Sequence, residues 1–429
     1  MKIYTQTLGC KVNQYETQAL ETMLQARGHT ICASPAESDV CIVNTCAVTA
    51  ESGRKSRQAI RRIQRENPGA FVAVCGCFSQ ISPEEVASLH ADMVYGSGDR
   101  CKFVDDLERL YREKQGDVCV DEALKRRTFE ELPAGNLSGR TRAMLKIQDG
   151  CSNFCTYCII PYARGPVRSM DPDHAAEKAA RLEKAGYREI VVTGIEIASY
   201  GRDLKTGVTL TDVVCAIGQS APNTRIRLGS LEPRIVTEDF CLRLKALPNF
   251  CPHFHLSLQS GCDKILAGMK RKYDTARFLQ SVRLLKQHFP GCGLTADLIV
   301  GFPGETDEDF QKTLDFIQLC GFSSMHIFPY SPRPGTVAAG MDGQVPKQVK
   351  HARAAAAGKV ASRIEQAFKE SCVGSVQRVL FEQEKDGVFT GHCENYCPVA
   401  VSGSNLHNTV LNVQITGVKD GILCGNAVL

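Results

Sequence analysis

The chain has 429 residues, enough for two to four domains, and 43% of them are hydrophobic, an ordinary fraction for a globular protein. Its net charge of +4 is too small to point to a nucleic-acid partner by itself. There is no run of about 18 apolar residues and no signal-peptide pattern, so we expect no membrane partner and a cytoplasmic location. In such a chain, 21 cysteines indicate metal ligation rather than a disulfide framework.

Residues 1–115 alternate between strand and helix patterns. Strands are predicted at 3–8, 39–43, 71–74 and 93–95, and helices at 14–27, 49–67, from 82 onward and at 102–112. This alternation predicts a small parallel α/β sheet.

Three cysteines of this unit each follow a predicted strand: Cys10, Cys46 and Cys77. The carboxyl ends of parallel strands open on one edge of a sheet, where such folds bind ligands. We therefore expect the three thiols to converge and to hold an iron–sulfur cluster. The alternative is three unconnected cysteines at the starts of loops. Cys75 could replace Cys77 as a ligand, although Cys77 is nearer the strand tip.

The helix predicted at 49–67 is strongly basic. Only Glu51 and Glu66 offset its positive residues, which are Arg54, Lys55, Arg57, Arg61, Arg62 and Arg65. Such a helix has either a solvated face or an anionic partner. Residues 116–136 follow the unit as a predicted linker, because they are charged and contain Pro133, Gly135 and Asn136.

Residues 137–366 form the largest predicted unit. Strands are predicted at 142–147, 189–193, 225–228, 253–258, 295–300 and 324–328, with helices at 172–185, 211–220, 237–246, 275–288 and 307–319. Six such units in series predict a parallel barrel or partial barrel, with its site at the carboxyl ends of the strands.

Directly after the first of these strands lie Cys151, Cys155 and Cys158, in a C-x3-C-x2-C spacing. Three cysteines so close together can bind three irons of a cubane cluster and leave the fourth iron for a ligand that is not protein. An open metal position is where chemistry occurs. A zinc knuckle or an incidental cluster is the alternative, but no histidine lies between Asp149 and Met170.

This spacing resembles the signature of radical S-adenosylmethionine (SAM) enzymes. The resemblance implies that the open iron binds the amino and carboxylate groups of SAM. One electron from the cluster then cleaves the sulfonium and gives a 5′-deoxyadenosyl radical.

Other residues near the ends of these strands are candidate SAM contacts. Glycines allow a close approach of the backbone, carboxylates can bind the ammonium group or the ribose, and an aromatic ring can pack on the adenine. The candidates are Tyr157, Gly194, Glu196, Ser230, Glu232, Gln259 and Gly301. For each of them the alternative is a residue that only forms a turn.

Residues 369–429 show five short alternating segments, at 373–382, 387–392, 398–402, 409–416 and 422–428. They predict a small antiparallel β-barrel, closed or half-closed. Barrels of this kind often bind RNA. This unit is slightly acidic, however, so its charge does not support such a role.

The whole chain resembles the methylthiotransferase family, with an N-terminal cluster domain, a radical SAM core and a C-terminal TRAM-like barrel. The segment Thr7-Leu-Gly-Cys-Lys-Val-Asn13 is similar to the branch that modifies N6-threonylcarbamoyladenosine in tRNA. The isopentenyladenosine branch has Tyr-Gly-Cys-Gln-Met-Asn and the ribosomal-protein branch Leu-Gly-Cys-Pro-Lys-Asn. Lys11 and Val12 therefore carry most of this substrate assignment.

The resemblance implies two [4Fe-4S] clusters as cofactors, one on each cysteine triad, with SAM as the other. The auxiliary cluster on Cys10, Cys46 and Cys77 would carry the sulfur. One SAM would supply the methyl group and a second the radical, so that C2 of the adenosine at tRNA position 37 becomes methylthiolated without a side-chain acid or base. The implied partners are tRNA, an electron donor protein and a sulfur source.

Several alternatives belong to other classes of function. Within the family, the substrate could be isopentenyladenosine in tRNA or a ribosomal protein. Outside it, the chain could be an iron–sulfur RNA-binding or redox-sensing protein without catalysis. It could also be a radical SAM dehydrogenase or ligase with an accessory cluster.

Overall fold

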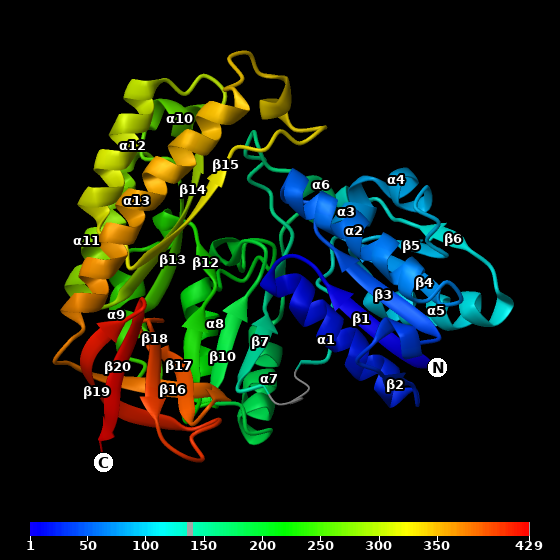
Figure 1. The fold of residues 1–429 in the computed structure, drawn as a ribbon, viewed down its shortest axis with the longest axis horizontal. Helices are drawn as coiled ribbons and strands as arrows, with labels where there is room; N and C mark the ends of the chain where they lie inside the picture. Colours follow the sequence, from blue (N-terminus) through cyan, green and yellow to red (C-terminus); the bar gives the residue numbers. More distant parts are fainter. Residues whose placement is uncertain (135–139, 429) are drawn as a thin grey trace.

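The computed structural model describes residues 1–134 and 140–428. The predicted boundary between linker and central unit, with Gly135 and Asn136, lies outside these residues. Figure 1 shows the N-terminal unit in blue beside the green and yellow central unit, and the C-terminal barrel in red below the central unit.

The N-terminal unit is a six-stranded, fully parallel sheet in the order β2-β1-β3-β4-β5-β6. Its strands are β1 (Lys2–Thr7), β2 (Thr30–Ile31), β3 (Val40–Thr45), β4 (Phe71–Gly76), β5 (Met93–Tyr95) and β6 (Asp117–Cys119). The last of these lies in the segment that was predicted to be a linker. The linker assignment is therefore wrong for residues 117–119, where a three-residue edge strand was too short to show a period.

Helices cover both faces of this sheet. They are α1 (Lys11–Ala26), α2 (Ala50–Glu66), α3 (Cys77–Ile81), α4 (Pro83–Ala87) and α5 (Arg100–Glu113). Leu20 of α1 and Phe103 of α5 pack on one face, while Ile60 of α2 and Phe78 of α3 pack on the other. Thr49 starts α2 with a capping box, since its hydroxyl accepts the amide of Ser52 at 3.0 Å.

The six predicted strands of the central unit are confirmed as parallel and in sequence order, and with the short extra strand β12 they form two sheets, β11-β10-β7 and β12-β13-β14-β15. A bridge between Ile226 and Phe250 joins them. The strands are β7 (Arg142–Lys146), β10 (Glu189–Thr193), β11 (Arg225–Leu228), the short β12 (Ser230–Leu231), β13 (His253–Gln259), β14 (Gly293–Val300) and β15 (Ser324–Pro329). The predicted partial barrel is thus confirmed.

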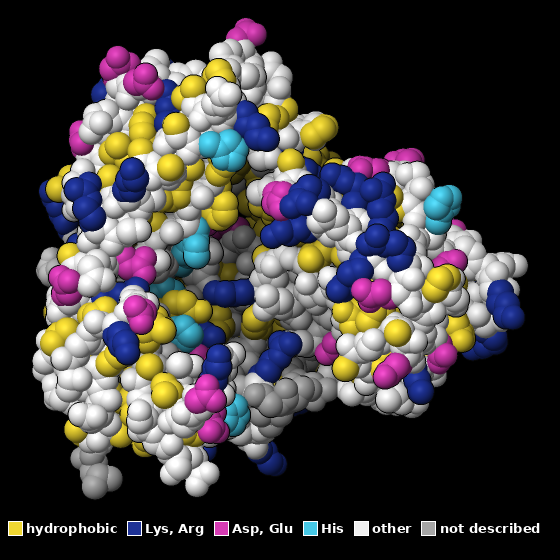
Figure 2. Space-filling view, viewed as in Figure 1, with side chains coloured by type: hydrophobic (Ala, Val, Ile, Leu, Met, Phe, Trp, Pro, Cys, Tyr) yellow, Lys and Arg dark blue, Asp and Glu magenta, His cyan; other side chains and the backbone are white. Residues whose placement is uncertain are grey.

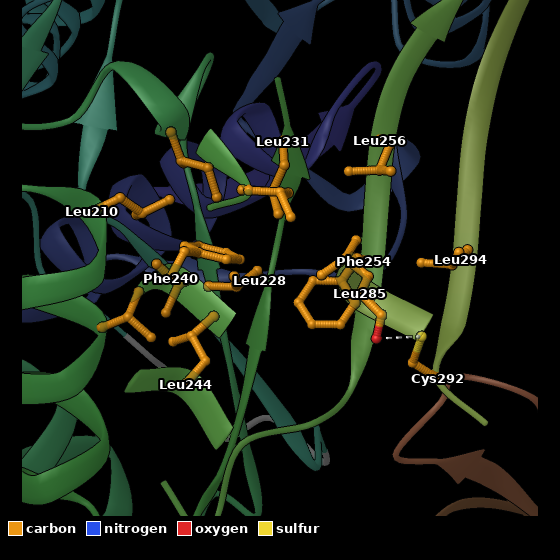
Figure 3. Close-up of a cluster of buried hydrophobic side chains, with 14 of the residues drawn as sticks. Leu210, Leu228, Leu231, Phe240, Leu244, Phe254, Leu256, Leu285, Cys292 and Leu294 are labelled. Carbon is orange, nitrogen blue, oxygen red and sulfur yellow. Dashed lines mark hydrogen bonds between the residues drawn. The ribbon is translucent and has the colours of Figure 1, made fainter. Parts of the chain in front are cut away.

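Helices pack against these strands from outside. They are α7 (Pro172–Lys184), α8 (Leu210–Ser220), α9 (Glu238–Lys245), α11 (Thr275–His288) and α12 (Asp307–Cys320). Figure 3 shows the core between them, where Leu228, Phe240 and Phe254 meet. Shorter elements lie near the barrel mouth: the antiparallel pair β8 (Gln148–Asp149) and β9 (Arg168–Ser169), α6 (Ile160–Arg164) and α10 (Asp263–Gly268).

The helix α13 (Lys347–Ser371), which was not predicted from the sequence, has 25 residues, packs on β15 and leads into the C-terminal barrel. That barrel is closed, in the order β16-β17-β18-β20-β19. Its strands are β16 (Val376–Lys385), β17 (Val388–Cys393), β18 (Pro398–Ser402), β19 (Val410–Lys419) and β20 (Ile422–Val428). The predicted antiparallel barrel is confirmed: four of its five strand pairs are antiparallel, and β18 and β20 close it as a parallel pair.

A buried ion cluster docks this barrel on the central unit. Glu189 accepts hydrogen bonds from Arg225 and Arg227, and all three side chains are at most 1% exposed. The two guanidinium groups also donate to backbone carbonyls of the barrel, among them those of His392 and Cys393. Removing one partner of such a cluster is costly, because buried charge is left without a counter-charge.

In the described part of the chain, each helix is too short or too polar to cross a membrane.

Candidate cluster and cofactor site

The structure brings Cys10, Cys46 and Cys77 together at one edge of the N-terminal sheet. Cys10 directly precedes α1, Cys46 follows β3 by one residue, and Cys77 starts α3 after β4. The chain leaves β1 toward β2 on one side, whereas β3 lies on the other side. This is the topological switch point at which open parallel sheets bind ligands.

Cys75 lies elsewhere, although it is only two residues from Cys77. Its side chain is fully buried and packs with Leu20 and Phe103 on the face covered by α1 and α5. Cys77 packs on the opposite face with Phe78. The geometry therefore favours Cys77 over Cys75 as the third ligand of this triad.

Gly9 and Asn13 shape the loop that carries Cys10. A Cβ atom at Gly9, whose φ is +111°, would lie 2.9 Å from Cys46 Cβ and 3.1 Å from its Sγ. The position therefore requires glycine. The amide of Asn13 donates to the carbonyls of Leu8 at 2.8 Å and Thr45 at 2.9 Å, so it holds the ends of β1 and β3 together.

A buried cationic network backs the triad. Arg164 of α6 donates from Nε to Cys77 Sγ at 3.2 Å and from a terminal nitrogen to Asn13 Oδ1 at 2.7 Å. Four buried cations share the two buried carboxylates Glu16 and Asp149; the cations are Arg100, Lys146, Arg164 and Arg168. This excess of positive charge suits the thiolates of an iron–sulfur cluster.

The surrounding protein raises the pKa of the Cys10, Cys46 and Cys77 thiols, because desolvation disfavours the thiolate. Arg164 opposes this effect at all three. Each pKa is also raised by a neighbouring cysteine of the triad: Cys46 acts on Cys10, Cys77 on Cys46, and Cys10 on Cys77. Three thiols that repel one another as thiolates are a suitable site for a cation, which would deprotonate them on binding.

The loop with Cys151, Cys155 and Cys158 follows β8 at the mouth of the barrel. Cys151 donates its amide to Gly165 O at 2.9 Å, and Thr156 donates its hydroxyl to Gly268 O at 2.8 Å, so both ends of the loop are anchored. Burial raises the pKa of Cys151 to about 11 and that of Cys158 to about 12.

Arg271 has the same relation to this second triad that Arg164 has to the first. It donates from a terminal nitrogen to Cys155 Sγ at 3.2 Å, and its guanidinium lies 4.9 Å from the ring centre of Tyr273. Each cysteine triad is therefore contacted by one arginine from another part of the chain.

Among the described residues, no three His, Cys, Asp or Glu side chains are grouped tightly enough to hold a single metal ion. In a cubane each cysteine binds a different iron, so its ligands are spread around a larger body.

The predicted SAM contacts fall into different surroundings. Glu196 lies over the cysteine loop, where its Oε2 accepts from Asn153 at 3.5 Å and its buried Oε1 has no partner. Burial raises its pKa, and the charge of Glu232 adds to this. Glu232 lines a small pocket with Asn153 and Cys155. Glu232 is already paired with Arg234, whose Nε atom donates to its two oxygens at 3.0 and 3.1 Å, so among the described residues Glu196 is the one of the two with an unpartnered oxygen.

Gly194 and Ser230 line a separate and larger cavity, whereas Tyr157 packs with Phe302 and Tyr330 under the cysteine loop. Gln259 ends β13 with a φ of +66°. Gly301 faces away from the mouth, since a Cβ atom there would lie 2.4 Å from Lys350 Cγ of α13. Its glycine is explained by helix packing, and this placement does not favour it as a SAM contact.

The larger cavity has a volume of about 710 Å³ and lies between all three units. Gly9, Cys10 and Lys11 line it from the N-terminal unit, Thr193 and Ser230 from the strand ends, and Tyr396 from the C-terminal barrel. Four histidines also face it: His253, His255, His326 and His392. The hollow is visible between the units in Figure 2.

Sequence reasoning missed the polar residues that support the triads. Arg164 and Arg271 are 87 and 116 residues from the cysteines they contact, so no local spacing indicates them. Asn13 was within reach of sequence reasoning, because it lies three residues after Cys10.

Comparisons with known proteins agree with this arrangement. Residues 145–317 match the Radical SAM superfamily, and residues 2–96 match the Uncharacterized protein family UPF0004. Among solved structures, the radical SAM methyltransferase TsrM from Kitasatospora setae is similar in fold, with a TM-score of 0.57 and 17% identity over 76% of this chain and 72% of that one.

Curated relatives match over nearly the whole chain. The threonylcarbamoyladenosine tRNA methylthiotransferase MtaB of Bacillus subtilis is 38% identical over 93% of this chain and 90% of its own length. The tRNA-2-methylthio-N(6)-dimethylallyladenosine synthase of Pelotomaculum thermopropionicum is 33% identical over 97% and 95%.

The barrel and its three-cysteine loop, together with the superfamily match, define a radical SAM enzyme. Within that class, the chain belongs to the methylthiotransferase family, and its cofactors are SAM and [4Fe-4S] clusters. The enzymatic interpretation is thereby confirmed over the binding or sensing alternative.

Proposed function

We propose that this enzyme methylthiolates C2 of N6-threonylcarbamoyladenosine at tRNA position 37. The similarity to tRNA methylthiotransferases supports a tRNA substrate. The identities of 38% and 33% to relatives named for two different adenosines do not by themselves separate the substrates. The distinction between the two adenosine substrates rests on Lys11.

Lys11 lies where the substrate cavity meets the N-terminal unit. It lines the 710 Å³ cavity together with Cys10, and it also lines an adjoining cavity with Arg142 and Arg227. The threonylcarbamoyl group carries a carboxylate, whereas the isopentenyl group is apolar. A lysine ammonium group beside Cys10 favours the carboxylate, because an enclosed anion needs a counter-charge.

In this proposal Cys151, Cys155 and Cys158 hold the cluster that binds SAM, while Cys10, Cys46 and Cys77 hold the auxiliary cluster. Reductive cleavage of SAM is the radical chemistry that this cofactor pair supplies when bound. The protein's own groups orient and enclose the reactants. Glu196 and Glu232 meet the SAM ammonium or ribose beside the cysteine loop, and Tyr157 and Gln259 are further SAM contacts in this proposal.

An electron donor protein and a sulfur source complete the proposal, since the reaction consumes both electrons and sulfur. The C-terminal barrel is proposed to be a TRAM-type module. Part of its acidic charge is neutralised within the protein, because Glu382 forms an ion pair with Arg142 of the central unit at 2.5 Å.

Mass spectrometry of tRNA nucleosides from a strain that lacks this gene tests the substrate. We expect threonylcarbamoyladenosine without its methylthio group, while methylthiolation of isopentenyladenosine continues. The opposite pattern would move the enzyme to the other tRNA branch, and an effect on neither would leave a ribosomal protein as the substrate.

The role of Lys11 is tested by complementing that strain with Lys11→Gln. Loss of a hydrogen bond to a charged group costs about 1.5–3 kcal/mol, so kcat/KM should fall roughly ten- to hundredfold. Lys102→Gln is the matched control, because Lys102 is an exposed lysine of α5 that does not line the cavity. Equal activity of both variants would contradict the assignment.

A further inference from the structure

The α2 helix presents a basic face that its own carboxylates do not neutralise. Arg54 pairs with Glu51, Arg57 with Glu85, and Arg62 with Glu66 at 3.8 Å. Among the described residues, Lys55, Arg61 and Arg65 have no carboxylate partner, and all three are exposed. Figure 2 shows Lys and Arg side chains gathered over this helix.

An arginine from the central unit extends this face. Arg333 follows β15, and a Cβ atom at Gly53 in the first turn of α2 would lie 3.7 Å from one of its terminal nitrogens and 3.6 Å from one of Arg57. The Arg333 Nε atom is buried and has no hydrogen-bond partner within the described chain. Cys46 and Glu85 are the negative groups that act on Arg333, but its buried Nε atom is left without a hydrogen bond, so this half-buried cation can bind an anionic ligand that approaches from outside.

The basic face begins close to Cys46, one of the cysteines of the first triad. Only three residues separate Cys46 from the first residue of α2, and the amide of Ala50 donates to Ser331 Oγ of the central unit at 3.1 Å. The guanidinium of Arg57 lies 5.8 Å from the ring centre of Phe78 in α3, and α3 in turn packs against α6. The face therefore runs from the rim of the active site outward.

Two aromatic side chains are exposed at the same rim. Phe154, inside the cysteine loop, is 43% exposed, and Tyr162 of α6 is 40% exposed. Their rings meet edge to face with centres 5.7 Å apart. Phe154 has a φ of +47°, a left-handed conformation that is costly for a bulky residue. The two exposed rings are accessible to a ligand at this rim.

We propose that the basic face of α2, with Arg333, and the Phe154–Tyr162 pair together form a docking surface for single-stranded loop nucleotides of an RNA substrate. Arginines bind phosphates in a bidentate manner, and exposed aromatic rings stack on unpaired bases. An acidic protein partner would bind the positive charges, but it would not need the pair of aromatic rings. The inference rests on the proposed tRNA substrate and assigns its loop to this surface rather than to the slightly acidic C-terminal barrel.

The experiment measures binding of a fluorescently labelled RNA hairpin that carries the anticodon loop, by anisotropy, over a range of salt concentrations. Three variants of the full chain, reconstituted with iron and sulfide, are compared with the unchanged protein. Arg61→Gln/Arg65→Gln removes two unpaired charges of α2. Tyr162→Leu removes a ring but keeps its apolar bulk. Lys184→Gln/Lys245→Gln removes two exposed charges from α7 and α9 as the matched control.

We expect the α2 double variant to bind the hairpin about tenfold more weakly and to lower the slope of log K against log salt by about 1.5, as the loss of two phosphate contacts requires. Tyr162→Leu should also weaken binding about tenfold, with the slope unchanged, because stacking does not depend on salt in this way. The control pair should stay within about twofold of the unchanged protein. Iron content and melting temperature show that each variant is folded.

Three results would overturn the inference in different ways. If the unchanged protein binds the hairpin and the α2 and Tyr162 variants bind it equally well, the docking surface is wrong while the proposed function stands. If the α2 variant instead slows reduction of the protein by an acidic electron-transfer protein, the surface binds that protein and not RNA. If the unchanged protein does not bind the hairpin at all, the proposed tRNA substrate fails as well.

Discussion

Arg164 donates a hydrogen bond from its Nε atom to the Sγ atom of Cys77 at 3.2 Å, although 87 residues separate them. The same guanidinium binds Glu16 of α1, and it lies 3.6 Å from Asp149, two residues before Cys151. One buried side chain thus connects the edge of the N-terminal sheet to the mouth of the barrel. The two cysteine triads are held in a fixed relation by this contact.

Arg164→Gln should lower the reduction potential of the cluster on the first triad. Reduction adds negative charge, and a cation beside a ligand sulfur stabilises the reduced form. Loss of the charged hydrogen bond should shift the potential by roughly 50–100 mV downward, measured by electron paramagnetic resonance during a redox titration. Arg164→Lys keeps the charge and should shift it less. An unchanged potential in both variants would show that the contact is only structural.

Acid should destabilise the metal-free protein through Glu16. Burial alone would raise the pKa of this carboxyl, but Arg164, Arg100 and Lys146 overcome burial and hold it well below its ordinary value of 4.5. A carboxyl whose pKa is lower in the folded state stabilises the fold above pH 4.5, and this stability is lost as the pH falls below that value.

We therefore expect the free energy of unfolding to fall in this range with a slope of up to about 1.4 kcal/mol per pH unit from Glu16. Glu16→Gln should flatten the slope by that amount, while costing roughly 3–5 kcal/mol at pH 7 because buried cations lose their partner. Urea unfolding followed by circular dichroism measures both. An identical pH dependence in the variant would contradict this role.

Cys75 and Cys77 should differ sharply when changed to alanine. Protein reconstituted without oxygen should hold about eight irons, as two cubanes require. Cys77→Ala should lose about half of this iron. Cys75→Ala should keep it and lose about 1 kcal/mol of stability, because its side chain is an ordinary part of the core. Iron loss in Cys75→Ala with full retention in Cys77→Ala would exchange the two roles.

Glu189→Gln should loosen the C-terminal barrel. The change leaves Arg225 and Arg227 buried without a carboxylate, a loss of roughly 3–5 kcal/mol. Limited proteolysis should then release the barrel earlier than from the unchanged protein. The control is Glu177→Gln, which removes a carboxylate whose pairing with Arg181 is exposed. Equal cleavage rates would show that the ion cluster does not hold the barrel.

Much of the fold, and several of the candidate ligands, could be predicted from the hydrophobic pattern of the strands and from the spacing of the cysteines. Cys10, Cys46 and Cys151 could be placed from sequence because each follows a strand whose hydrophobic pattern is local. The arginine contacts could not, since they join distant segments through tertiary packing. The pairing of β18 with β20 was missed for a similar reason: alternation predicts a strand but does not specify its partner.

Packing offers a second explanation for Gly301. Gly301 follows β14 in a glycine-rich turn, which favoured a ligand contact, yet the space that a side chain would need is occupied by Lys350 of α13. That helix itself was not predicted, so the reason for the glycine could not be seen from the sequence.

The central claim is that the two triads hold separate clusters with different roles, and a paired assay of two variants tests it most directly. Cys46→Ala should still release 5′-deoxyadenosine from SAM under dithionite but form no methylthio product, whereas Cys155→Ala should do neither. Cys41→Ala is the control, because Cys41 is fully buried within β3; it should lose about 1 kcal/mol of stability and keep both activities. Full methylthiolation by Cys46→Ala, or release of 5′-deoxyadenosine by Cys155→Ala, would contradict the account.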